Sequence, residues 1–421
     1  SSGETITTYE STQLALHNLD DDTDVTVAVS SSDTGEATVG PATLTFTEDN
    51  WNTPQTVTVT GVNDNNSDGH QEYEVGLSAK RTEIDFEKEN PEVTTFAGSS
   101  QGSTDATGTS ASFKNPEGIT TDGTNLYVVD RNNHLIRKIV ISTGVVTTLA
   151  GSGSPGSTDA TGTSASFNIP KRITTDGTNL YVTEYTNNRI RKIVISTGVV
   201  TTLAGSSSGF ADGTGTSASF KEPIGITTDG TNLYVADRGN HRIRKIVIST
   251  GVVTTLAGSG TSGTTDATGT SARFYNPMGI TTDGTNLYVL DTNNLRIRKI
   301  VISTGVVTTL AGSTEGSTDG TGTSAKFKYP MGITTDGTNL YVLDSQNHRI
   351  RKIVISTGVV TTLAGSSDGF ADGTGTSARF AMPFGITIDG TNLYVSDNNN
   401  HRIRKIDLSK KETTDLSLHN L

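Results

Sequence analysis

The chain has 421 residues, of which 18% are charged and 32% are hydrophobic, with 46 glycines and no cysteine. This composition is typical of short strands joined by many turns, and it excludes a largely helical chain, a disordered chain and a disulfide framework. The net charge of -12 argues against nucleic acid as a partner, because phosphate would be repelled. No apolar run reaches the length of a membrane-spanning helix, and the composition favours an extracellular or cell-surface bacterial protein.

Charge is distributed unevenly along the chain. Residues 1–90 contain 18 acidic and 3 basic residues, a net charge of -15, whereas residues 91–421 contain 26 acidic and 29 basic residues, a net charge of +3. A step of this kind predicts a domain boundary. We therefore expect an acidic domain over residues 1–90 and a second domain over residues 91–415.

The acidic domain is expected to be a β-sandwich. Apolar and polar residues alternate, as they do in half-buried strands, over residues 24–29, 42–47, 55–60 and 73–77. Several such strands in about ninety residues are typical of a sandwich. The stretch from Ser32 to Asp64 resembles the Calx-β-like and related Ig-like modules of large bacterial surface proteins.

One loop of this domain has the spacing of a calcium-binding loop. Asp64, Asn66 and Asp68 precede Gly69, and oxygen ligands at alternate positions converge when the chain turns sharply at such a glycine. The twelfth position is Val75 rather than the Glu that completes an EF-hand. Two interpretations stay open: a Ca²⁺ site, and a polar turn between two strands. No other cofactor is expected.

Residues 91–415 contain one unit written six times. The triplet Leu-Tyr-Val begins at Leu126, Leu180, Leu233, Leu287, Leu340 and Leu393. Each unit predicts four strands, which in the third unit cover residues 225–228, 233–236, 243–248 and 252–257. Four antiparallel strands recurring about every 53 residues predict a propeller blade. The fold class is therefore all-β, with an N-terminal sandwich followed by a six-bladed propeller of four-stranded blades.

The ring is expected to close through a displaced strand. The sixth unit loses the repeat pattern after Ile406, whereas residues 92–97 form an orphan fourth strand before the first unit. We expect this segment to pair with residues 402–406.

The repeat resembles a known family. Leu-Tyr-Val-x-Asp-x-x-Asn-His-x-Ile-Arg-Lys-Ile, preceded by Ala-x-Phe-x-x-Pro-x-Gly-Ile, is similar to the NHL repeat, and the clearest copies contain Asn240-His241, Asn347-His348 and Asn400-His401. Most departures fall in the second unit, and the substituted positions are Lys171, Arg172, Glu184, Asn188 and, in the fourth unit, Leu295.

The six units differ most where the innermost strand begins, at the mouth of the central channel. The residues that follow the proline of each unit are Glu117, Lys171, Ile224, Met278, Met331 and Phe384. Together with Arg172 and Tyr185, they predict a ligand-binding face in which an apolar crescent lies beside a charged patch. The alternative is that recently duplicated units have drifted, and that Met and Phe only plug the channel.

The repeated polar residues are interpreted as structural, and no catalytic residue is predicted. Ring symmetry keeps four histidines away from a common metal, so we expect hydrogen bonds to the loop aspartates from His134, His241, His348 and His401. The Arg-x-Arg-Lys rows of the third strands are interpreted as a solvated rim, and the Asp-x-x-Gly-Thr-Ser-Ala loops as turns.

The two ends of the chain resemble each other. Residues 412–421 match residues 10–19 at seven of ten positions, which predicts that residues 416–421 begin a following sandwich or link neighbouring subunits. We therefore expect a non-enzymatic, extracellular structural or adhesive protein whose units bind neighbouring copies and build a fibre or surface array. Two alternatives are a module that binds a glycan or a surface protein through the variable face, and a lyase- or hydrolase-like propeller enzyme.

Overall fold

The computed structural model describes residues 25–32, 34, 37–46, 55–61, 75–79 and 87–413. Contacts divide the chain into two units, one formed by Ser1–Phe86 with Thr413–Leu421 and the other by Glu87–Glu412. Every regular element of the described residues is a strand or a single 3-10 turn, so the described chain is all-β.

The first unit contains two small antiparallel sheets. β1 (Val25–Ser31) lies between β3 (Thr43–Phe46) and β5 (Val75–Ala79), and β2 (Ala37–Gly40) pairs with β4 (Thr58–Gly61). The strands fall within or beside the alternating segments of the sequence. The complete sandwich stays a prediction. The candidate calcium ligands Asp64, Asn66 and Asp68 lie outside the described residues, as do residues 416–421.

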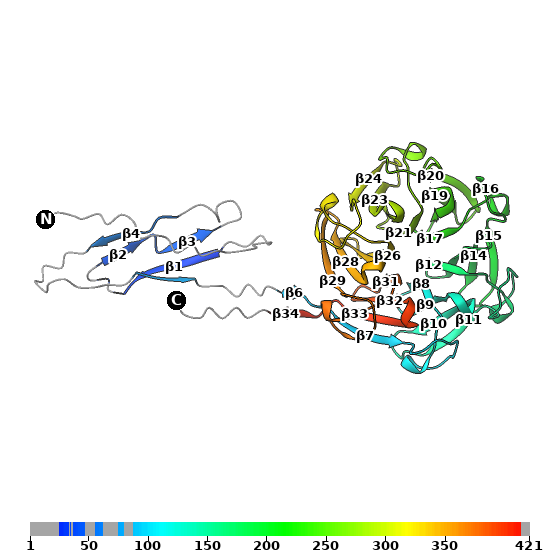
Figure 1. The fold of residues 1–421 in the computed structure, drawn as a ribbon, viewed down its shortest axis with the longest axis horizontal. Helices are drawn as coiled ribbons and strands as arrows, with labels where there is room; N and C mark the ends of the chain where they lie inside the picture. The colour runs from blue at the N-terminus through cyan, green and yellow to red at the C-terminus, as the bar shows by residue number, and fades with distance from the viewer. Residues whose placement is uncertain are drawn as a thin grey trace, which may run out of the picture. The chain divides into compact units, whose positions relative to one another are not determined.

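The second unit is a ring of six blades (Figure 1). The innermost strands are β8 (Pro116–Thr121), β12 (Pro170–Thr175), β17 (Pro223–Thr228), β21 (Pro277–Thr282), β26 (Pro330–Thr335) and β31 (Pro383–Ile388). The second strands are β9 (Asn125–Asp130), β13 (Asn179–Glu184), β18 (Asn232–Asp237), β22 (Asn286–Asp291), β27 (Asn339–Asp344) and β32 (Asn392–Asp397).

The outer half of each blade follows the same scheme. The third strands are β10 (Leu135–Val140), β14 (Arg189–Val194), β19 (Arg242–Val247), β23 (Arg296–Val301), β28 (Arg349–Val354) and β33 (Arg402–Asp407). The fourth strands of blades one to five are β11 (Val146–Ala150), β15 (Val200–Ala204), β20 (Val252–Ala257), β24 (Val307–Ala311) and β29 (Val359–Ala364). Three blades add a two-residue fifth strand: β16 (Gly213–Thr214), β25 (Gly320–Thr321) and β30 (Gly373–Thr374).

Two kinds of 3-10 turn also recur, one in all six units and the other in every unit except the second. The Gly-Thr-Ser turns in the loops before the blades are η1 (Gly108–Ser110), η3 (Gly162–Ser164), η4 (Gly215–Ser217), η6 (Gly269–Ser271), η8 (Gly322–Ser324) and η10 (Gly375–Ser377). Those between second and third strands are η2 (Arg131–Asn133), η5 (Arg238–Asn240), η7 (Thr292–Asn294), η9 (Ser345–Asn347) and η11 (Asn398–Asn400).

The displaced strand closes the ring as expected. β7 (Glu92–Ala97) pairs antiparallel with β33, with Val93 opposite Ile406 and Ala97 opposite Ile403. Before β7, β6 (Glu87–Glu89) is hydrogen-bonded to β34 (Lys411–Thr413), which follows β33. The incoming and outgoing segments of the propeller therefore lie side by side (Figure 1).

Each blade turns tightly at an Asp-Gly pair. In blade three, Gly230 has a φ of +86°, which favours glycine, and the Asp229 carboxylate accepts hydrogen bonds from the Thr231 and Asn232 amides. The Tyr234 hydroxyl donates to the same carboxylate at 2.8 Å. Burial alone would raise the pKa of Asp229, but these hydrogen bonds outweigh it and hold the pKa below 3.8.

The hydrophobic core lies between neighbouring blades. One cluster combines Tyr234, Ala236 and Ile243 of blade three with Phe274 and Leu287 from the loop and second strand of blade four. A single blade therefore cannot bury its apolar face alone, which is why the units need a closed ring.

Histidines join neighbouring blades, which corrects the expectation that they bond the loop aspartates. Nδ1 of His241 accepts the Asn276 amide of the next blade at 3.2 Å, and His134 accepts the Ile169 amide at 3.3 Å. His401 and His348 make the same bond to the amides of Asn115 and Met382. The donating residue precedes the proline of the next blade, so the bond anchors its innermost strand.

These histidine bonds make the stability of the ring sensitive to mild acid. Burial and neighbouring cationic side chains lower the pKa of His134, His241 and His401 below 6.5. Only a neutral Nδ1 can accept the hydrogen bond from the amide, so protonation at Nδ1 breaks it. A pKa lowered by folding means that the contribution is present above pH 6.5 and is lost as the pH falls below it.

We expect the triple variant H134N/H241N/H401N to lose less stability than the wild type when the pH falls from 7 to 5. Asn188 performs the same task in blade two, where its Oδ1 accepts the Glu222 amide at 2.9 Å without titrating. Denaturant titrations at both pH values measure the difference. Equal losses in the two proteins would contradict the assignment.

Candidate functional site: the channel mouth

The apolar residues predicted at the mouth meet in one cluster. Ile224, Met278 and Met331 are buried against one another, and partly buried Tyr185, Tyr329 and Phe384 pack around them. These side chains come from the starts of first strands in blades three to six and from adjoining loops. The cluster forms the apolar crescent expected from the sequence.

The charged residues meet on the other side of the mouth. The Glu117 carboxylate is 1% exposed, and Oε1 lies 3.0 Å from Lys171 Nζ and 3.2 Å from Arg131 Nη1. Arg172 Nη1 lies 3.9 Å from the second carboxylate oxygen. Burial lowers the pKa of Lys171 and of Arg172, while the Glu117 charge opposes both shifts. Lys171 also lies over the Tyr185 ring at 5.4 Å, which joins the two halves of the mouth.

Arg172 occupies a position that is glycine in the other five units. There the innermost strands approach so closely that a Cβ on Gly225 would collide with the Met278 carbonyl oxygen. Blade two differs because the Thr183 hydroxyl lies between the strands: it accepts from the Arg172 amide at 3.0 Å and donates to the Ile224 carbonyl at 2.7 Å. The same blade therefore carries both the larger side chain and the hydroxyl that accommodates it.

The residue that follows the loop Asp or Glu also differs between the two halves of the mouth. Of these six residues, only Tyr185 was predicted from the sequence to be part of the site. In blades four to six, small polar side chains donate to the proline carbonyl of the next blade: Thr292 to Pro330, Ser345 to Pro383 and Asn398 to Pro116. In blades one to three the position holds Arg131, Tyr185 and Arg238, and Arg238 pairs with Glu222. Comparison of the residue that follows the loop Asp or Glu in each of the six units would have revealed the large side chains.

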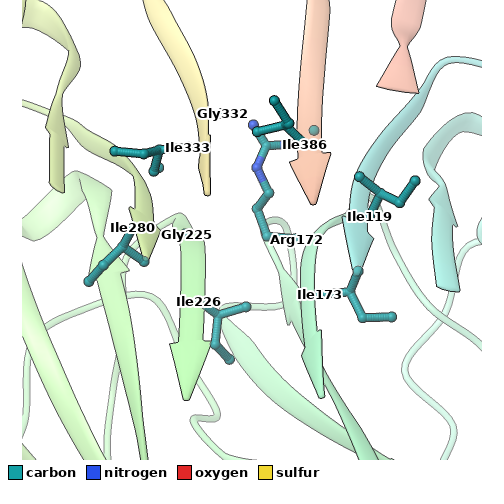
Figure 2. A pocket seen from close by; sticks show the side chains of 11 residues that line it. Ile119, Arg172, Ile173, Gly225, Ile226, Ile280, Gly332, Ile333 and Ile386 are labelled. Carbon is teal, nitrogen blue, oxygen red and sulfur yellow. The ribbon is translucent and has the colours of Figure 1, made fainter. Parts of the chain in front are cut away.

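A small cavity lies in the channel beside the mouth residues (Figure 2). It measures about 50 Å³ and is lined by Arg172, by the glycines of four units and by the isoleucine of every unit. Drug-sized ligands need about 300 Å³ or more. The mouth residues therefore fill the channel and form a surface with no deep pocket at this place.

Aromatic side chains stand on loops at the rim, covered by arginines. Phe210 is 45% exposed and Phe370 is 44% exposed. The guanidinium of Arg242 lies 3.6 Å from the Phe210 ring centre, and that of Arg402 lies 3.7 Å from the Phe370 ring centre. Tyr275, 40% exposed, contacts the His241 ring edge-on.

The interpretation of the Arg-x-Arg-Lys rows as a solvated rim is wrong for the second arginine. In every blade that side chain is fully buried between two carboxylates, and the six residues are Arg137, Arg191, Arg244, Arg298, Arg351 and Arg404. One carboxylate belongs to the loop Asp or Glu184, and the other to the Asp-x-x-Gly-Thr-Ser-Ala loop. These loops are therefore ion-pair partners as well as turns.

Among the described residues, no group of three or more His, Asp or Glu side chains could hold a metal ion. In the same residues, no helix is long and apolar enough to cross a membrane.

The geometry defines a six-bladed β-propeller. The sequence profile described as NHL repeat matches residues 220–246, which contain the first two strands of blade three, the loop after them and most of the third strand. This part of blade three therefore matches an NHL repeat.

The chain is also similar to several known proteins. NHL repeat-containing protein 2 of Homo sapiens is 29% identical over 328 residues, which cover 68% of this chain and 45% of that protein, so the chain spans less than half of this relative. A structural genomics protein of unknown function from Bacteroides thetaiotaomicron has a TM-score of 0.60 at 22% identity and 90% coverage of both chains. An auxiliary nutrient binding protein from the same organism has a TM-score of 0.58 at 17% identity, covering 91% of this chain and 90% of that one. The two structural likenesses concern the fold.

Proposed function

We propose that the propeller is a non-catalytic binding module that recognises another protein through the channel mouth. The observation that carries the proposal is the filled mouth itself, where an apolar cluster lies directly beside a cluster of charged side chains around Glu117. Protein interfaces combine aromatic and Met anchors with arginines in this manner, and they need a surface rather than a deep cavity. The auxiliary nutrient binding protein of similar fold adds support for a binding role.

The partly exposed anchors give a direct test. We expect the variant Y185A/Y329A/F384A to lose at least about ten-fold in affinity for binders selected on the wild type from a displayed peptide library, because truncated anchors typically cost more than 1 kcal/mol. Biolayer interferometry measures the affinities. If the wild type binds glycans from a panel but no peptides from the library, and the mouth variant loses that binding, the face recognises carbohydrate instead.

A matched control changes the opposite face. Val145, Val199 and Val306 follow the Ser-Thr-Gly turns and are 36–37% exposed, so V145A/V199A/V306A removes exposed apolar surface without touching the mouth. Binders that survive the mouth variant but not this control would refute the proposal.

A second function is favoured by the pairing of β6 with β34. The chain therefore enters and leaves the ring at one place. This allows the propeller to project sideways from a row of sandwich domains. We propose on this basis an extracellular array in which neighbouring copies associate. Sedimentation velocity is expected to show association as the concentration rises from 1 to several hundred micromolar, on the order of the affinities of transient interfaces. A single monomeric species throughout would exclude association of copies.

A further inference from the structure

Arg172 carries a buried positive charge into the central channel. Its side chain is 9% exposed and runs from the innermost strand of blade two across to blades five and six (Figure 2). Nη2 donates to the carbonyl oxygens of Met331 and Phe384 at 3.0 and 2.9 Å. These carbonyls carry no net charge, so they satisfy hydrogen bonds without neutralising the guanidinium.

The charges around Arg172 do not balance. Among the described residues, Glu117 is the only carboxylate within ion-pair distance of Arg172, and it is shared with Lys171 and Arg131. Its shorter contacts go to those two residues, whereas 3.9 Å to Arg172 is too long for a hydrogen bond. Three cations thus surround one carboxylate, and buried charges in proteins are normally paired.

One nitrogen of the guanidinium also lacks an acceptor. Nη1 of Arg172 is buried and has no hydrogen-bond partner in the described part of the chain. A buried donor without an acceptor costs free energy, and such groups call for an explanation such as an ion. The missing acceptor and the missing negative charge therefore concern the same side chain.

The channel has room for the missing group. The cavity of about 50 Å³ is lined by Arg172 itself. A water molecule needs roughly 10–15 Å³ of such space, so the cavity accommodates a small ion with a few waters and excludes organic ligands. Its isoleucine side chains favour a weakly hydrated monovalent anion over a multivalent one.

We infer that the channel holds a small monovalent anion of the chloride class, bound by the Arg172 guanidinium as the counter-charge of the Glu117, Lys171 and Arg131 cluster. The ion would stay bound in the central channel and stabilise the ring. It is independent of any partner at the mouth, so its presence and the proposed binding function are tested separately.

The test compares sodium chloride with sodium gluconate at equal ionic strength, so that screening is the same. In the full-length protein, chloride is expected to raise the melting temperature by roughly 2 °C or more at saturation. The shift should vanish in Arg172→Gln, which removes the charge, and in Arg172→Gly, which restores the residue of the other units. It should persist in Arg296→Gln, which removes a rim charge. Equal shifts in all four proteins would overturn the inference.

Wild-type crystals soaked in sodium bromide provide a readout that needs no variant. An anomalous peak is expected in the channel, in contact with the Arg172 guanidinium. Only water in that cavity at saturating bromide would overturn the inference, even if adventitious bromide ions bind elsewhere.

Discussion

Replacing Arg244 by alanine is expected to destabilise the propeller by about 3–5 kcal/mol. The side chain is fully buried, with Nη1 2.8 Å from Asp237 and Nη2 2.6 Å from Asp212. Asp237 is also fully buried, so removal of the guanidinium leaves an uncompensated carboxylate in the interior. Guanidinium chloride denaturation followed by circular dichroism measures the loss.

Arg242 provides the matched control, because it lies two residues earlier in the same strand. Its guanidinium is partly exposed, covers the Phe210 ring and donates to the Ser259 carbonyl at 2.9 Å. Such an exposed contact is worth about 0.5–1 kcal/mol, so Arg242→Ala should cost little. Similar losses in the two variants would show that the buried ion pair has no special role.

The pH dependence separates lost charge pairing from lost packing. Burial raises the pKa of Asp237 above 3.8, although hydrogen bonds from Asn240 and the Lys221 amide and the charge of Arg244 oppose the shift. A pKa raised by folding means that the folded state takes up protons more readily, so acid favours it. Loss of the Arg244 charge and hydrogen bond removes two of the effects that oppose this shift, so the pKa of Asp237 is higher still in the variant. The deficit of Arg244→Ala should therefore shrink as the pH falls from 7 toward 4, whereas that of Arg242→Ala should not.

Replacing Val93 by aspartate is expected to open the ring, at a cost of roughly 4 kcal/mol or more. Val93 is fully buried in the strand that closes blade six, opposite Ile406. A carboxylate there has no partner among the apolar residues of that cluster. Without β7, the edge of β33 is left unpaired, and each edge of an open ring exposes apolar surface. Limited proteolysis and calorimetry should both report the loss.

Thr94 supplies the control for this change. It lies next to Val93 but is only partly buried, and its register partner is Lys405. An aspartate at this position places opposite charges across the strand pair, which is neutral or mildly stabilising. If Thr94→Asp destabilises the ring as strongly as Val93→Asp, charge in the strand rather than burial of Val93 is responsible.

The ring was predictable because its information is repeated in the sequence. Six copies of Leu-Tyr-Val at a nearly constant spacing predict the blades, and the orphan segment at residues 92–97 predicts the closure. The gathering of the residues after each proline follows from the same symmetry. The sandwich was harder to predict, because each of its four alternating segments occurs once and cannot be compared with other copies in the chain.

The burial of the second arginine was not predictable from alternation. A β-bulge between Ile243 and Arg244 shifts the register of the third strand against the fourth, so Ile243, Arg244 and Ile246 are all buried. A strict period of two cannot place all three residues inside. The partner Asp212 also lies 32 residues earlier in a loop that seemed to be only a turn.

Contacts between blades were missed for a related reason. His241 bonds an amide 35 residues further along, and Thr292 donates to the Pro330 carbonyl of the next blade from a loop position whose residue type changes around the ring. Each unit looks self-contained when it is compared only with the other copies. The sequence therefore predicted the composition of the mouth better than the bonds within it.

The pairing of β6 with β34 has a mechanical consequence. Because β7 runs antiparallel to β33, tension applied through the two chain ends arrives at one end of the closing pair. The short β6–β34 ladder is then loaded first, and we expect it to separate before force reaches the strand that closes the ring. Separation of this ladder alone would release a short length of chain while the six-bladed ring stays closed.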